Sequence, residues 1–315
     1  MNIFFRNLSV LLLSILLIAC SSDRQRGNTN SLSGLMAMYN PQGMKHKRDK
    51  NSISKIREMA LKETALSLGA QSALAWHAQN INASLNEQAR ELDTLYDFNA
   101  LVLENNVLPP VLLEGRNTLN LADTQTIRIS NRTYKVAKQA RFITTPPHWR
   151  NYLWMDFKTP DYPSTLLLPK NDLEKQVWRH FIIQGWDQGI EQAKIILEES
   201  TARIKEDYLG MILYRKLLDM NMVSPPYVSH TDLGVTGDAS EIHIDDQVLR
   251  ITALPALNIN SAEWKAAVLK TDADLERLHA LEEKVRESKL SLDTHVPAWK
   301  PVISPINETS GAIHD

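Results

Sequence analysis

The chain has 315 residues, a formal net charge of −2 at pH 7 and 43% hydrophobic residues. Proteins that bind nucleic acids usually present a strongly basic surface, so this balance argues against nucleic-acid binding as the main role. The composition is that of a globular protein, and the length allows one large domain or two small ones.

The first 19 residues are typical of a bacterial secretory signal. Arg6 precedes an apolar run from Leu8 to Ala19, and this run of about 12 residues is too short to span a bilayer. The following stretch, Leu17-Ile18-Ala19-Cys20, resembles the lipobox of bacterial lipoproteins. The resemblance implies cleavage before Cys20 and acylation of its thiol with diacylglycerol and of its new amine. The alternative is a chance cysteine beside a signal.

Cys20 is the only cysteine in the chain. The mature protein can therefore form no internal disulfide, Cys-based zinc site or free catalytic thiol. The rest of the sequence has no apolar run of membrane-spanning length, so we expect the lipid to be the membrane anchor. Ser21 takes the place of the Asp that retains most inner-membrane lipoproteins, which by resemblance favours the outer membrane.

Residues 20–51 are expected to form a flexible tether with an r.m.s. reach of roughly 30 Å. An apolar patch within it is either part of the coil or a segment that orders on a partner. The patch comprises Leu32, Leu35, Met36, Met38 and Tyr39. The basic run at 45–50 is interpreted as a solvated cluster, with anionic lipid or an acidic neighbour as the alternative.

Two long helices are predicted. The first covers residues 52–97, with apolar residues near the 3.6-residue period and a possible bend at Gly69. The second begins after Asn171, with Glu174 three residues later as a cap, and runs to about Met222. Gly185 and Gly189 share a face of this helix, which predicts the close approach of another backbone.

Strands are predicted between and after these helices. Residues 105–115 should be extended because of their prolines. Residues 126–136 predict a hairpin with Ile127, Ile129, Tyr134 and Val136 on its buried side, and residues 241–251 predict another around Asp245-Asp246-Gln247. Asn260 with Glu263 predicts the cap of a third helix to about Leu290.

An aromatic segment covers residues 144–154. It is interpreted either as a loop that its tryptophans pack on the core or as a protein contact surface, where Trp, Tyr and Arg are favoured. The contact candidates are Trp149, Arg150, Tyr152 and Trp154.

These features predict an α+β body over residues 52–296, with long helices packed against small antiparallel hairpins. Residues 1–19 are the signal peptide, and residues 297–315 form a tail with three prolines.

No motif for chemistry is convincing. The chain lacks the phosphate-binding loop, the His-Glu-x-x-His helix and the Gly-x-Ser-x-Gly elbow. Glu241, His243 and Asp245 would share one side of a strand and could bind a metal, but a solvated hairpin face is the preferred interpretation. Asp93 and Asp97 are interpreted as exposed side chains. We therefore expect no catalytic residue, no metal and no cofactor apart from the lipid on Cys20.

Most of residues 53–265 resembles the DotC family of lipoproteins from the Dot/Icm (type IVB) secretion system, a family related to the TraI protein of plasmid conjugation. The longest matching stretch continues from residue 114 to 123, then through 139–142 to 149–153. Further matches are Arg57-Glu58-Met59-Ala60-Leu61, Ala65-Leu66-Ser67-Leu68-Gly69-Ala70, Ala75-Trp76, Leu108-Pro109-Pro110-Val111-Leu112 and Trp186-Asp187-Gln188-Gly189.

This resemblance implies a role rather than a reaction. It implies a non-enzymatic subunit in a multi-copy ring of an outer-membrane core complex that exports effectors or DNA. The implied partners are a DotD-like lipoprotein, a DotH-like outer-membrane subunit and DotG-like and DotF-like subunits. Two other classes remain as alternatives: an enzyme that remodels peptidoglycan, and a solute-binding lipoprotein. The second would need alternating strand–helix units, which the sequence lacks.

Overall fold

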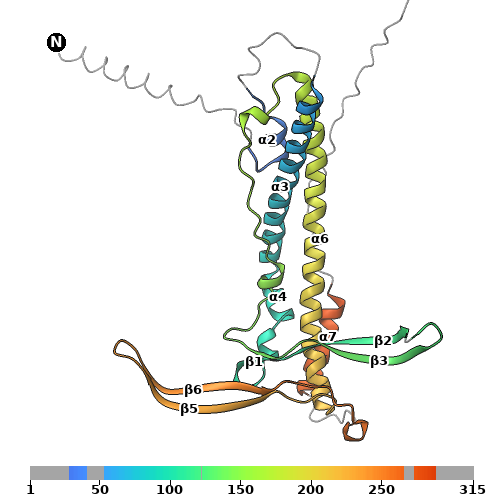
Figure 1. The fold of residues 1–315 in the computed structure, drawn as a ribbon, viewed down its shortest axis with the longest axis vertical. Coiled ribbons are helices and arrows are strands. Elements are labelled where there is room, and N and C mark those ends of the chain that lie inside the picture. The colour runs from blue at the N-terminus through green and yellow to red at the C-terminus, as the bar shows by residue number, and fades with distance from the viewer. Residues whose placement is uncertain (1–27, 41–52, 122, 266–272, 289–315) are drawn as a thin grey trace, which may run out of the picture.

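The computed structural model describes residues 28–40, 53–121, 123–265 and 273–288. Two long helices, α3 (Lys55–Glu87) and α6 (Asp172–Asp219), lie side by side and form an elongated rod (Figure 1). The 48 residues of α6 span about 72 Å at a rise of 1.5 Å per residue. Asn171 caps α6 as predicted, since its side chain accepts a hydrogen bond from the backbone N–H of Glu174 (2.8 Å).

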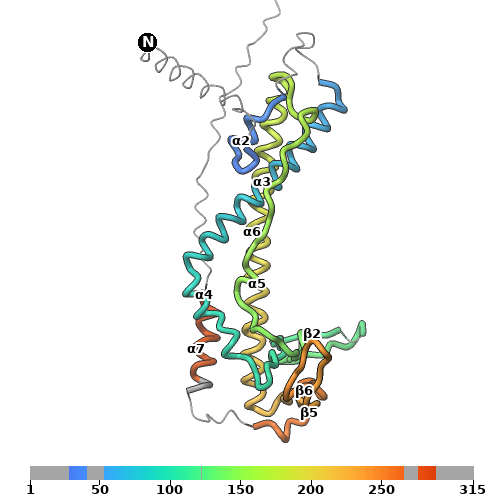
Figure 2. The backbone as a smooth tube through the Cα atoms, turned by 90° about the vertical axis from the view of Figure 1, so that its left-hand side faces the viewer, coloured from blue at the N-terminus to red at the C-terminus, as the bar shows by residue number. Residues whose placement is uncertain are grey.

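The two helices run in the same direction, because Gly185 of α6 faces Leu66 of α3 and Gly189 faces Ala70. The chain must therefore return along the rod between them, and it does so as a largely extended segment that runs the length of the rod (Figure 2). Asn82 of α3 holds this segment by pairing with the backbone of Met155, donating to its carbonyl (2.7 Å) and accepting from its N–H (3.1 Å). The return segment is thus bound to the rod through its own backbone groups.

Glycines allow the close contact between α3 and α6. A Cβ atom at Gly185 would lie 2.4 Å from the carbonyl oxygen of Leu66, and one at Gly189 would lie 2.2 Å from that of Ala70. The prediction of a close backbone neighbour is confirmed. At Gly69, where the sequence allowed a bend, α3 continues without a break, and a Cβ there would meet the carbonyl of Ile182 at 2.6 Å. The helix breaks instead at Gln88, after which α4 (Ala89–Leu95) follows.

Part of the expected tether packs on the rod. Helix α2 (Leu32–Met36) lies at one end, where Leu35 and Met38 are buried beside Trp178 of α6. The indole N–H of Trp178 donates to the carbonyl of Leu35 at 2.9 Å. The flexible-tether prediction is therefore wrong for residues 28–40, whose apolar patch orders on its own chain. Residues 1–27, with Cys20, and the basic run at 45–50 lie outside the described residues.

Two long β-ribbons leave the opposite end of the rod and extend to opposite sides of it (Figure 1). The first arm pairs β2 (Val111–Leu121) with β3 (Ile127–Lys138), and the second arm pairs β5 (Tyr227–Gly237) with β6 (Ile242–Ala253), both antiparallel. A third, minimal ladder joins β1 (Val107–Leu108) to β4 (Arg141–Phe142).

The predicted hairpins are wrong in detail. Residues 127–138 form a single strand, and so do residues 242–253; each pairs with the strand before it. Ile127 and Ile129, expected on a buried side, are 60% and 70% exposed, whereas Tyr134 and Val136 are partly buried. Alternation identified strands correctly, but it could not show that the arm projects away from the core.

The remaining elements lie around the arm end of the rod, except for the turn at Thr165–Leu167, which lies at the α2 end. They are α5 (Arg150–Leu153), α7 (Ala273–Glu287) and four 3-10 turns at Phe98–Leu101, Glu104–Asn106, Thr165–Leu167 and Ser261–Glu263. The third helix starts later than predicted: Asn260 caps only a 3-10 turn, and α7 begins at Ala273. Residues 289–315, with the predicted tail, lie outside the described residues.

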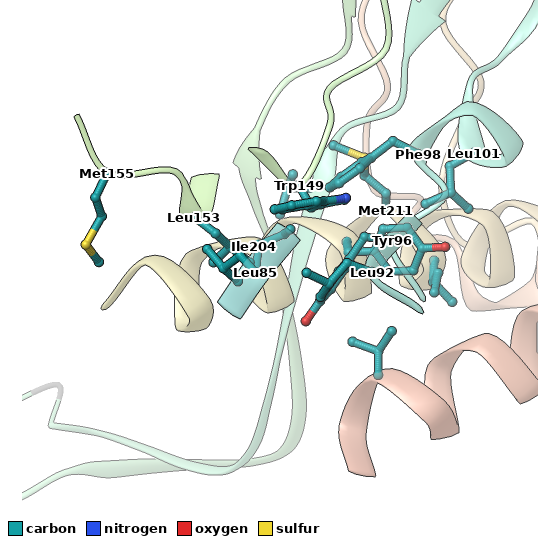
Figure 3. Packing of buried hydrophobic residues seen from close by; sticks show 14 of the residues in the cluster. Leu85, Leu92, Tyr96, Phe98, Leu101, Trp149, Leu153, Met155, Ile204 and Met211 are labelled. Atoms are coloured by element: carbon teal, nitrogen blue, oxygen red, sulfur yellow. The ribbon is translucent and has the colours of Figure 1, made fainter. Parts of the chain in front are cut away.

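The architecture is the α+β class predicted, with long helices packed together and small two-stranded antiparallel sheets. A core at the arm end joins α3, α4, α5, α6 and α7 through buried aromatic and aliphatic side chains (Figure 3). Within the described ranges, no helix combines the length and apolar character needed to cross a membrane.

Candidate interaction surface

The aromatic segment lies where the arms leave the rod, and its first tryptophan belongs to the core. Trp149 is fully buried, and its indole N–H donates to Oδ1 of Asp93 at 2.6 Å. Leu153, one helical turn later, is also buried. The segment is therefore packed on the core by Trp149, as the first of the two interpretations predicts.

Asp93 organises the outer side of this segment. The Nε2 atom of His148 lies 3.0 Å from the carboxylate oxygen that accepts from Trp149. The hydrogen bond from Trp149, with that from His148, lowers the pKa of Asp93. The guanidinium of Arg150 lies 4.2 Å from the centre of the Trp149 ring and donates to Asn86. Asp93 thus fixes the segment and is more than an exposed side chain.

A buried carboxylate, which the sequence interpretation missed, ties this segment to the first arm. Asp207 of α6 accepts a hydrogen bond from the Tyr152 hydroxyl (2.9 Å). It also forms an ion pair with Nζ of Lys138 (2.6 Å). Burial and then the Asp207 charge raise the pKa of Tyr152, which keeps its hydroxyl protonated as the donor. The Tyr152 ring stacks on Phe98. The sequence signal for Asp207 was its place between Ile204 and Met211 on the apolar side of a long helix.

The contact candidates therefore differ in what they offer to a partner. Trp149 is inaccessible, and Tyr152 is partly buried with its hydroxyl occupied. Arg150 is partly exposed, and Trp154 keeps 44% of its surface in solvent. A contact at this segment stays a prediction, and Trp154 and Arg150 are the side chains able to make it.

The carboxylate groups considered for chemistry are spread out. Asp97 caps the turn at Phe98–Leu101 by accepting from the N–H of Ala100 at 3.3 Å. Glu241 and His243 lie 3.8 Å apart on the second arm, but Asp245 has a φ of 57°, which interrupts the alternation expected to align it with them. Over the part of the chain that the structure describes, no three His, Cys, Asp or Glu side chains could together hold a metal ion.

Another ion pair stabilises the α2 end. Arg57 of α3 and Glu174 of α6 meet at 3.0 Å, and the same guanidinium donates to the carbonyl oxygens of Leu166 (2.6 Å) and Leu168 (2.7 Å). The bidentate fork of arginine suits this joint recognition of a carboxylate and two carbonyls. It joins the return segment to both helices of the rod, so its role is structural.

Comparison with known proteins adds a family to this geometry. A comparison with curated proteins gives no match. Residues 55–266 match a family described as type IV secretory system, conjugal DNA-protein transfer. The matched range begins at the start of α3 and includes α6 and both arms. The chain therefore belongs to the TraI family of the type IV secretory system.

Proposed function

We propose that the chain is a lipid-anchored structural subunit of the outer-membrane core complex of a type IVB secretion system, of the DotC kind. The observation that carries this proposal is the family match over residues 55–266, which includes the whole rod and both arms. The lipobox-like sequence ending at Cys20 and the whole-sequence resemblance to DotC support the finer assignment. A rod with projecting arms suits a part that holds other subunits in place.

The proposed partners are those of the DotC family. A DotD-like lipoprotein and this chain would place a DotH-like subunit at the outer membrane, and DotG-like and DotF-like subunits would join that assembly. The body would face the periplasm, with acyl chains on Cys20 as the anchor. Exported effectors or DNA would pass through the complex without being altered by this chain.

The position of α2 gives this anchor a geometric consequence. A chain spans at most ~3.6 Å per residue, so the link from Cys20 to Asn28 reaches at most about 29 Å. Because α2 packs at one end of the rod, the lipid would hold that end near the membrane surface. The arms would then be carried about 70 Å away, at the other end of α6. The rod would thus separate the anchored end from the arms.

Replacing Cys20 tests the anchor. Acylation contributes about 0.8 kcal/mol per buried CH₂, so several chains make release negligible. Cys20→Ala should therefore miss the outer membrane on fractionation, the DotH-like partner should fail to reach it, and export should fall. Ser22→Ala is the matched control and should fractionate normally. The proposal fails if Cys20→Ala protein still floats with outer membranes in a strain that lacks every partner.

A further inference from the structure

The tip of the first arm exposes an apolar face. Leu119 pairs with Ile129 and Leu121 pairs with Ile127, and residues paired across a ladder or two apart along a strand share a face. All four are at least 60% exposed. The opposite face at the same level carries Asn120 and Arg128. One side of this tip is therefore a continuous aliphatic surface.

The tip of the second arm repeats the arrangement. Ile242 and Ile244 lie two apart on β6 and share a face, and Val235 lies on the partner strand at the register shift between Gly234 and Thr236. Their exposed fractions are 67%, 75% and 69%. His243 and Thr236, which pair with each other, occupy the other face. Each arm thus exposes aliphatic side chains at its tip.

Such ribbons are poorly suited to stand alone in water. An isolated two-stranded ribbon is marginally stable, and its unpaired edges together with an exposed apolar face favour association. The arms leave the same end of the rod on opposite sides, so the two tips of one chain do not meet (Figure 1). A partner from another chain would cover them.

The charges of the arms indicate which partner. In residues 111–138 the basic side chains outnumber the acidic ones: Arg116, Arg128, Arg132, Lys135 and Lys138 against Glu114 and Asp123. In residues 227–253 the excess is acidic: Asp232, Asp238, Glu241, Asp245 and Asp246 against Arg250. Hydrogen bonds from Ser240 lower the pKa of Asp238, which keeps that carboxylate ionised near the tip. Opposite charges steer one arm type toward the other.

We infer that the first arm of one copy docks on the second arm of the next copy, with the aliphatic tips buried together and the opposite net charges of the two arms favouring the encounter. Contact between two different surfaces is heterologous, and it closes into a ring when the rotation between copies permits. This inference extends the proposed function by naming the contact between copies. It rests on that function only for the presence of many copies in one complex.

Cysteine cross-linking of the full chain tests the contact. Ile129→Cys combined with Ile244→Cys, treated with a short bis-maleimide in cells and after purification in detergent, should give a ladder of dimers and larger oligomers. Ile129→Cys alone and Ile244→Cys alone should give none, and they also control for Cys20. The matched control pairs Ile129→Cys with Ile56→Cys, since Ile56 is exposed on the rod; it should give no ladder.

Charge reversal tests the direction of docking. Arg128→Glu and Glu241→Lys should each reduce the ladder roughly fivefold, because each lowers the opposite net charge that steers the first arm toward the second. Arg128→Lys, which keeps the charge, should leave the ladder unchanged. These readouts need no lipid, so they are independent of the Cys20 experiment.

Three results would overturn the inference: a cross-linked dimer from either single cysteine, which means that like arms meet; an equal ladder from the Ile56 pair; or cross-links to other proteins alone. If the ladder is missing while Cys20 still decides outer-membrane fractionation, the arm contact is wrong and the proposed anchor role stands. A ladder in a chain whose fractionation ignores Cys20 would mean the reverse.

Discussion

The rod and the arms use similar aliphatic residues in opposite ways. In the rod, side chains such as Leu61, Ile81 and Ile182 are completely buried between helices of the same chain. In the arms, Ile129 and Ile244 lie in solvent. The periodicity of a segment thus shows which residues share a face, whereas the covering of that face depends on what is near it in space. Folding free energy should therefore reside in the rod, and association free energy in the arms.

The largest expected effect comes from Trp149. Trp149→Ala removes a fully buried indole and leaves Asp93 without its hydrogen-bond donor, so it should lower the free energy of unfolding by about 3–5 kcal/mol. The matched change in an arm is Tyr227→Ala, at an exposed aromatic residue, which should stay within about 0.5 kcal/mol. Thermal and denaturant unfolding of the purified full chain measures both. Equal losses would contradict the division between rod and arms.

Trp149→Ala also bears on the contact prediction for the aromatic segment. If partner co-purification falls only as far as stability does, Trp149 acts through packing alone. Trp154→Ala then gives the cleaner test, because half-exposed Trp154 should affect co-purification with little change in unfolding.

The next effect concerns the seam between α3 and α6. Gly189→Leu forces atoms into the carbonyl of Ala70, and overpacking of this kind costs about 1–3 kcal/mol. Gln188→Leu is the matched control, because Gln188 is the exposed neighbour on the same helix. A lower melting temperature for Gly189→Leu alone is expected. If the two variants have the same melting temperature, α3 and α6 can move apart at Gly189 at little cost in stability.

The sequence predicted those parts of the molecule in which local chemistry decides the structure. The Asn171 cap and the pairing surface at Gly185 and Gly189 follow from residue type and spacing, and both are confirmed. The hairpin turns were wrong, because a polar triplet inside a strand has the same composition as a turn. The buried position of Leu35 could not be predicted either, since it depends on Trp178, which lies far along the chain. Asp207 was missed for the same reason: its partners are distant in sequence.

The smallest expected effect is a pH dependence that should arise in the rod. His77 of α3 is buried, and neither ring nitrogen has a hydrogen-bond partner among the described residues. Burial, and then the Lys194 charge, lower its pKa. The unfolded chain therefore binds a proton at a pH where the folded chain does not. A neutral His77 makes its full contribution to the free energy of unfolding above about pH 6.5. That contribution falls as the pH drops toward the folded pKa, by at most ~1.4 kcal/mol per pH unit.

His77→Phe should remove that part of the pH dependence, because phenylalanine fills similar space without a titrating nitrogen. The control is His243→Phe on the second arm, where the imidazole is exposed. Unfolding free energies measured between pH 5 and pH 8 should show a shallower slope for His77→Phe and an unchanged slope for His243→Phe. If the arm variant flattens the slope instead, the arms contribute to folding free energy, and the contrast between self-sufficient rod and partner-dependent arms is wrong.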